Sequence, residues 1–150
     1  DMDWTLRALA AELGEAELGP EDFAPLALPA VPEGALTLAK VGVAIGALMP
    51  EDTIVVDEGV SSSYHLGPGV RRGRGHDVLT ITGGSIGFGL PAAVGAAVAC
   101  PDRKVVVLEG DGSGMYTLQS LWTMAREGLD VTVVLIANRG YQILRNELAA

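Results

Sequence analysis

The sequence predicts an α/β domain whose parallel sheet is covered by helices on both faces. Apolar runs of strand length alternate with stretches of helical spacing, which is the pattern of a doubly wound sheet. The strand-like runs are almost continuously apolar, as expected when helices cover both faces of a sheet. Two of these runs end in a polar residue, Asp111 and Asn138, with one helix-length segment between them. In a right-handed βαβ unit both residues lie at the same edge of the sheet.

The first part of the chain is predicted to lie outside this domain. Helical spacing of apolar residues predicts an amphipathic helix over residues 1–18, with Gly14 as a stop signal. Residues 19–34 are rich in proline, alanine and acidic side chains, which indicates a linker. We interpret the helix as the tail of a preceding domain and residues 35–150 as the sheet domain. Because the chain stops soon after Asn138, we expect the domain to be incomplete at its C-terminus.

Within the domain, strands and helices are expected to alternate. The predicted strands are 53–56, 77–81, 105–108 and 131–136, and the predicted helices are 36–48, 92–99 and 118–126. Pro50 ends the first helix, and Pro91 occupies a favoured position at the start of the second. Residues 64–74 are left as an unassigned polar segment.

Composition excludes several classes of protein. The net charge of −9 argues against nucleic-acid binding, and no apolar run reaches membrane-spanning length without glycine or charge. The one cysteine, Cys100, cannot form an internal disulfide, and we expect it to be a buried thiol at a helix end. These features predict a cytoplasmic protein with neither a nucleic acid nor a membrane as partner.

Asp111 and Asn138 are the best candidates for a functional site. Carboxylate and amide oxygens suit Mg²⁺ or Ca²⁺, and the backbone carbonyl of Gly140 can supply a third oxygen. Gly110 and Gly112 allow close approach of a ligand, and Ser113 can cap the following helix. The alternatives are that Asp111 is only a helix cap and that Asn138 only turns the chain.

Other polar segments have both a functional and a structural interpretation. The glycine loop at 83–89 can hold a heterocycle or a phosphate with its bare amides, or it is simply a tight turn. The segment 57–63 follows a strand at the same edge and can bind phosphate, or it is a solvated turn. His65 and His76 are expected at the surface, whereas Trp122 is expected in the core.

Together these motifs resemble a known family. Gly110-Asp111-Gly112, followed after twenty-five residues by Asn138, resembles the thiamine-diphosphate motif of the acetolactate synthase and benzoylformate decarboxylase group. Residues 84–93 and 57–59 resemble further segments of the same group, and the likeness covers residues 36–148. The chain thus resembles the C-terminal diphosphate-binding (PP) domain and its thiamine-diphosphate-binding fold. The resemblance implies part of a 2-oxo acid decarboxylase or acetolactate synthase-like enzyme, which cleaves or joins C–C bonds next to a carbonyl.

The resemblance also implies cofactors and residue roles. Thiamine diphosphate and Mg²⁺ are the expected cofactors, with Asp111, Asn138 and the carbonyl of Gly140 as metal ligands. Ile86 is expected to bend the cofactor, and the carbonyl of Gly84 to accept its amine. The other expected contacts with the cofactor are Glu58, Gly59, Val60, Ser61, Ser85, Gly110, Gly112, Ser113 and Tyr141.

Two departures from the family pattern affect the expected activity. Ala137 stands where the family has the first of two asparagines. The catalytic glutamate of the family lies in a pyrimidine-binding domain, usually of a neighbouring subunit, and nothing in this chain corresponds to it. We therefore expect a homodimer or homotetramer, no catalytic residue in these 150 residues, and no turnover by them alone. The alternatives are a separate PP subunit of a split decarboxylase and a non-catalytic homologue that retains the fold.

Overall fold

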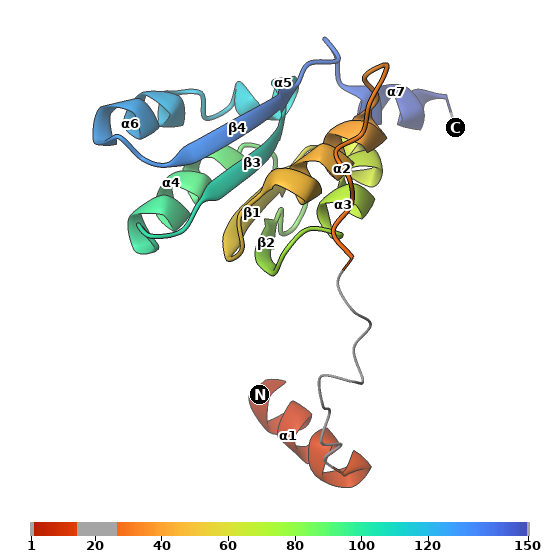
Figure 1. Ribbon diagram of the computed structural model, residues 1–150, viewed down its shortest axis with the longest axis vertical. Helices are drawn as coiled ribbons and strands as arrows, with labels where there is room; N and C mark the ends of the chain where they lie inside the picture. The colour runs from red at the N-terminus through yellow and green to blue at the C-terminus, as the bar shows by residue number, and fades with distance from the viewer. Residues whose placement is uncertain (1, 15–26, 150) are drawn as a thin grey trace.

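The computed structural model describes residues 2–14 and 27–149, and in these its central element is a four-stranded parallel sheet (Figure 1). The strands are β1 (Thr53–Glu58), β2 (His76–Thr80), β3 (Val105–Gly110) and β4 (Val131–Ile136). Their order across the sheet is β2-β1-β3-β4, and every neighbouring pair is parallel. The predicted α/β fold class is therefore confirmed.

Side chains alternate between the two faces of the central strands and build two separate cores. On one face Ile54, Val56, Val105 and Val107 pack against α4 (Gly89–Ala99) and against Met124 of α6 (Gln119–Glu127). On the other face, the intervening residues of β1 and β3 pack against α2 (Leu38–Leu48) and α3 (Ser63–Val70). The same alternation decides on which face of the sheet the polar side chains at the ends of β1 and β3 lie.

Helix α3 occupies part of the segment that the sequence pattern left unassigned. It contains Pro68 and two glycines, which weaken any helical signal. It forms because it packs on α2 with almost no side chains between the two backbones: an ideal Cβ on Gly69 would lie 2.3 Å from the nitrogen of Val43. Tertiary packing thus overrides local propensity here.

The remaining predicted elements agree with the structure within a few residues. Helix α2 begins at Leu38, capped by the Thr37 hydroxyl, which accepts a hydrogen bond from the Lys40 amide at 3.3 Å. Strands β1 and β3 run to Glu58 and Gly110, two residues beyond their apolar runs. They extend because neighbouring strands remain available for pairing.

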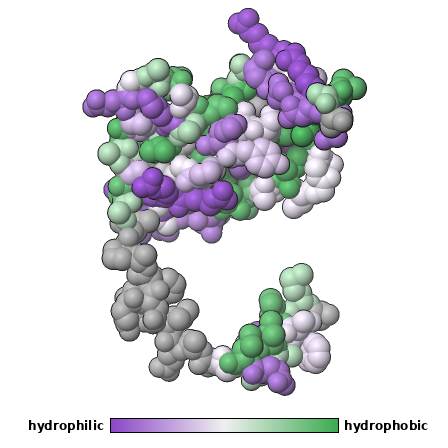
Figure 2. Space-filling view, turned by 90° about the vertical axis from the view of Figure 1, so that its right-hand side faces the viewer, coloured by the Kyte–Doolittle hydropathy of each residue, from purple (hydrophilic) through white to green (hydrophobic). Residues whose placement is uncertain are grey.

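The N-terminal helix α1 (Met2–Leu13) ends at the predicted stop, since Gly14 has a φ of 78°. None of its residues is buried, and Figure 2 shows hydrophobic residues exposed on it. Residues 15–18 of the predicted helix and 19–26 of the predicted linker lie outside the described residues. From residue 27 the linker enters α2 without regular structure up to residue 33.

Three sequence expectations are corrected. Ser113 does not cap a helix: it lies inside a short helix, α5 (Asp111–Gly114), that follows β3 directly. Trp122 is not a core residue but is 63% exposed on α6, where the Arg126 guanidinium lies 4.9 Å from its ring centre. The core side of α6 is occupied by Met124 instead. Cys100 lies at the end of α4 as expected, but it is only half-buried.

Among the described residues no helix combines the length and the apolar character that crossing a membrane requires. His65 is exposed as expected, whereas His76 is half-buried, and its ring Nδ1 lies 2.7 Å from the carbonyl oxygen of Arg74.

Candidate functional site

A small cavity of about 60 Å³ lies at the carboxyl ends of β1, β3 and β4. Its walls come from the segments after these strands, from the glycine loop, and from the start of α7 (Gln142–Leu148). The lining residues are Gly59, Val60, Ser61, Ser62, Ile86, Gly110, Asp111, Gly112, Ser113, Ile136, Asn138, Gly140, Tyr141, Gln142 and Ile143. All the predicted site residues except Glu58, Gly84 and Ser85 are therefore gathered at one place.

The register of β3 and β4 brings Asp111 and Asn138 together. Gly110 pairs with Ile136, so the two polar residues follow neighbouring strand ends. Asp111 Oδ2 accepts a hydrogen bond from the amide of Arg139 at 2.9 Å, which ties the two loops together. Asn138 Oδ1 accepts from the amide of Gly140 at 3.0 Å. Both residues line the cavity, and their carboxylate and amide oxygens are of the hard kind that Mg²⁺ prefers.

Gly110 and Gly112 contribute only backbone to the cavity lining, and this part of the lining is called the floor. An ideal Cβ on Gly112 would lie 2.8 Å from Cε1 of Tyr141, and one on Gly110 would lie 3.0 Å from the hydroxyl of Ser113. Any larger residue at position 112 would displace the tyrosine ring. Together with the oxygens of Asp111 and Asn138, this floor suits a ligand that carries both phosphate groups and a metal ion.

The loop after β1 forms the opposite wall. Asp57 Oδ1 accepts hydrogen bonds from the Gly59 amide at 3.1 Å and from the Ser63 hydroxyl, which folds the chain into a short 3-10 helix, η2 (Val60–Ser62). Val60 has a φ of 48°, a conformation that costs a β-branched residue about 1–3 kcal/mol. The surrounding hydrogen bonds hold this strained residue on the cavity wall.

Glu58 does not line the cavity, so its predicted contact with a cofactor stays a prediction. It continues the alternation of Ile54 and Val56, so its side chain enters the face covered by α4, where it is 1% exposed. Its carboxylate accepts hydrogen bonds from the backbone amides of Gly87, Phe88 and Gly89, at 2.8, 3.0 and 2.6 Å.

Glu109 is a feature that the sequence reasoning missed. It pairs with Glu58 in the sheet register and is fully buried on the same face. Among the described residues neither of its carboxylate oxygens has a hydrogen-bond partner. Burial, reinforced by the charge of Glu58, raises the pKa of Glu109 to about 8, so the group is largely neutral at pH 7. The sequence position of Glu109 could have indicated its burial. Because side chains alternate along a strand, Glu109 lies on the same face as Val105 and Val107, which is the face covered by α4.

Gly84 and Ser85 lie on an exposed loop next to the cavity. Gly83 and Gly84 both have positive φ values, of 71° and 74°, which only glycine adopts without strain. Of this loop only Ile86, which directly follows Ser85, lines the cavity. The roles of Gly84 and Ser85 toward a ligand stay predictions.

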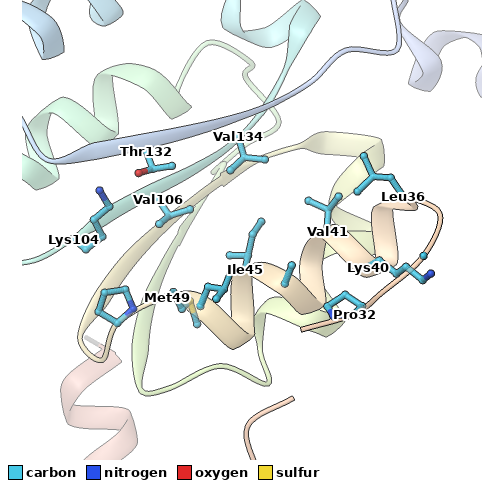
Figure 3. Close-up of a pocket in the computed structure, with 14 residues that line it drawn as sticks. Pro32, Leu36, Lys40, Val41, Ile45, Met49, Lys104, Val106, Thr132 and Val134 are labelled. Atoms are coloured by element: carbon cyan, nitrogen blue, oxygen red, sulfur yellow. The ribbon is translucent and has the colours of Figure 1, made fainter. Parts of the chain in front are cut away.

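A larger hollow of about 440 Å³ lies elsewhere, between α2 and the adjoining face of β3 and β4 (Figure 3). Val41, Ile45, Val106 and Val134 point into it, with Lys104 at one end. It has no carboxylate or amide side chain among its lining residues, so it lacks the side-chain oxygens of a Mg²⁺ site, and its lining is mostly apolar. The smaller, polar cavity is therefore the candidate site.

A parallel sheet with glycine-rich loops, a carboxylate and an amide at its carboxyl edge defines a cofactor-binding α/β domain. The model of the family described as "Thiamine pyrophosphate enzyme, C-terminal TPP binding domain" matches residues 64–150. The chain belongs to this family.

Relatives in the family agree. A Mycobacterium tuberculosis protein assigned only provisionally as an acetolactate synthase large subunit, IlvX, is 50% identical over 95% of this chain and 27% of its own length. An α-keto-acid decarboxylase of Mycobacterium avium is 43% identical over 66% of the chain and 17% of its own length. The chain thus spans about a quarter or less of the curated relatives that it matches.

Solved structures show the same fold. The thiamine diphosphate-dependent 4-hydroxybenzoylformate decarboxylase of Rhodococcus jostii superposes with a TM-score of 0.72 at 30% identity, over 97% of this chain and 28% of its own. Benzoylformate decarboxylase of Polynucleobacter necessarius superposes with a TM-score of 0.67 at 26% identity, over 84% of this chain and 24% of its own. The chain therefore carries a C-terminal thiamine-diphosphate-binding domain, and the relatives that it matches are named as acetolactate synthase-like or α-keto-acid decarboxylase proteins.

Proposed function

We propose that this domain holds thiamine diphosphate through Mg²⁺ in an enzyme that cleaves or joins the C–C bond next to the carbonyl of a 2-oxo acid. The observation that supports this most directly is the convergence of Asp111 and Asn138 on one glycine-floored cavity. Bound thiamine diphosphate supplies the carbanion chemistry, and the protein positions it and shields it from water.

Each wall of the cavity has a distinct part in this proposal. Asp111, Asn138 and the carbonyl of Gly140 hold Mg²⁺, and the floor at Gly110 and Gly112 lets the diphosphate approach. The further residues proposed to contact the cofactor all line the cavity: Gly59, Val60, Ser61, Ser113 and Tyr141. Ala137 removes an amide beside the metal site but none of the three proposed ligands.

The site needs a partner domain to become catalytic. We infer that a pyrimidine-binding domain of a neighbouring subunit, in a homodimer or homotetramer, covers an exposed apolar surface next to the cavity. This surface, called the α6 apolar surface, consists of Leu121 and Trp122 of α6 and of Met115, Tyr116 and Leu118 just before the helix, and these side chains are 38–67% exposed. It adjoins the glycine loop, because the Thr117 hydroxyl donates a hydrogen bond to the Gly87 carbonyl at 3.1 Å. Exposed apolar area of this kind marks an interaction site.

Calorimetric titration of the intact protein with thiamine diphosphate, with Mg²⁺ and then with EDTA, tests the proposal. Wild-type protein should bind only with Mg²⁺, and Asp111→Ala should weaken binding by at least a hundredfold, because it removes a charged metal ligand. Asp102→Ala, an exposed aspartate outside the cavity lining, is the control and should bind like wild type. Binding that survives EDTA or the Asp111 substitution would exclude the metal site.

The two alternative functions predict different results. A separate PP subunit of a split decarboxylase would have a native mass near the 15.5 kDa of this chain and would need a second protein for turnover. A non-catalytic homologue would not bind the cofactor in the intact protein. The cytoplasmic location stays a prediction that rests on the single cysteine.

A further inference from the structure

We propose that Glu58 is a positioning residue: its carboxylate holds the glycine loop through three backbone amides and thereby sets the place of Ile86 on the cavity wall. This inference rests on the proposed function, because Ile86 matters only if the cavity holds the cofactor. It gives Glu58 an indirect role, different from the direct contact with the cofactor that the resemblance implied.

The hydrogen bonds of Glu58 join residues that are far apart in the sequence. Glu58 Oε1 accepts from the amides of Gly87 and Phe88, and Oε2 accepts from the amide of Gly89, residues 29–31 positions further along. Phe88 is the N-cap residue of α4, and its side chain makes no capping bond. The carboxylate of β1 therefore caps a helix that belongs to another part of the chain, where negative charge is favoured by the helix dipole.

Burial makes this arrangement rigid. Glu58 is 1% exposed, and bonds between a carboxylate and amides in such surroundings are stronger than those between neutral groups. An ideal Cβ on Gly89 would lie 2.9 Å from Glu58 Oε2 and 2.4 Å from Glu109 Oε2. Glycine at position 89 therefore lets the start of α4 approach both carboxyl groups closely.

The three hydrogen bonds from Glu58 to the loop amides are called the clamp, and the residue before them in the sequence lies at the cavity. Ile86 immediately precedes the three clamped amides and lines the cavity, whereas Gly83 and Gly84 before it adopt left-handed conformations in an exposed turn. Glu58 itself is followed at once by Gly59, Val60 and Ser61 on the opposite wall. One buried side chain thus fixes the spacing between two walls of the site.

Amide hydrogen exchange in the intact protein tests the clamp without the cofactor. In wild type the amides of Gly87, Phe88 and Gly89 should exchange at least tenfold more slowly than that of Ser85. Glu58→Gln keeps the size of the side chain but offers one acceptor oxygen and an NH₂ group that opposes an amide donor. It should speed exchange at all three amides by at least tenfold, whereas the exposed control Glu51→Gln should not.

Cofactor binding tests the consequence for Ile86. Glu58→Gln should raise the Kd for thiamine diphosphate with Mg²⁺ by at least tenfold. In an Ile86→Ala background the same substitution should change the Kd less than twofold, because it acts through that side chain. Equal effects in both backgrounds would overturn the proposal.

The outcomes separate the two hypotheses. If wild type binds no cofactor, the proposed function fails, while the exchange rates still decide whether Glu58 holds the loop. If Glu58→Gln does not fold, the comparison within wild type decides: exchange at Gly87, Phe88 and Gly89 as fast as at Ser85 would refute the clamp. A folded Glu58→Gln protein that binds as tightly as wild type would refute it as well.

Discussion

At the scale of single residues, the unusual chemistry of this domain lies in a pair of buried carboxyl groups beneath the candidate site. Glu58 has three amide donors, but Glu109 has no hydrogen-bond partner among the described residues. Leaving a charged carboxylate in that position would be costly, so the protonated form of Glu109 is favoured and its pKa rises to about 8.

This raised pKa predicts a pH dependence of stability. In the unfolded chain Glu109 ionises near pH 4.5, but in the folded domain it keeps its proton until about pH 8. The folded state thus binds more protons in this window, and its stability falls as pH rises from about 5 to 8. Glu109→Gln mimics the neutral acid and should remove this loss, which is on the order of 3–4 kcal/mol between pH 5 and 8.

Urea unfolding of wild type and Glu109→Gln at pH 5, 6.5 and 8 measures the effect. The difference in unfolding free energy between the two proteins should grow with pH in favour of the variant. Glu127→Gln, at an exposed residue of α6, should show no such trend. Parallel pH profiles for wild type and Glu109→Gln would contradict a neutral buried Glu109.

At the scale of elements, the contact between α2 and α3 supports the β1 side of the site. Gly42, Gly46 and Gly69 allow the two helix backbones to touch, and an ideal Cβ on Gly42 would lie 2.2 Å from the Leu66 carbonyl oxygen. Because α3 follows η2 directly, its position also holds the wall formed by Val60 and Ser61.

Gly69→Ala should therefore destabilise the domain by about 1–3 kcal/mol, since the added methyl group meets backbone atoms that cannot move independently. Gly95→Ala in α4 is the matched control, because its Cβ would meet nothing within 4 Å. It should stabilise the protein by about 0.5–1 kcal/mol through helix propensity alone. Chemical denaturation of both variants provides the measurement, and equal effects would show that the close helix contact is unimportant.

At the scale of the whole molecule, α6 presents apolar side chains to solvent. Met124 and Ser120 face inward, which leaves Leu121 and Trp122 on the outer side. An ordinary amphipathic helix keeps its large apolar side chains on the buried face, but α6 also has two on its exposed face. Exposed apolar side chains of this kind are typical of an interface.

If the α6 apolar surface contacts a second subunit, Trp122→Glu should shift the intact protein to a smaller species in sedimentation velocity and weaken cofactor binding. Its effect on the stability of the domain should stay within about 0.5 kcal/mol, because the side chain is already exposed. Val98→Glu is the control: Val98 in α4 is also 63% exposed but lies outside this surface. An unchanged sedimentation coefficient for Trp122→Glu would exclude this surface from the subunit contact.

The sequence by itself determined the strands, most of the helices, and the convergence of Asp111 and Asn138, because these follow from local periodicity and from the geometry of parallel βαβ units. Only the tertiary structure decided the existence of α3, the exposure of Trp122, and the inward turn of Glu58 onto the amides of α4. These features depend on contacts between residues far apart in the chain, where close backbone packing and burial outweigh local propensity. For the same reason Glu109, an unremarkable strand residue in the sequence, becomes a buried neutral acid only when β1, β3 and α4 enclose it.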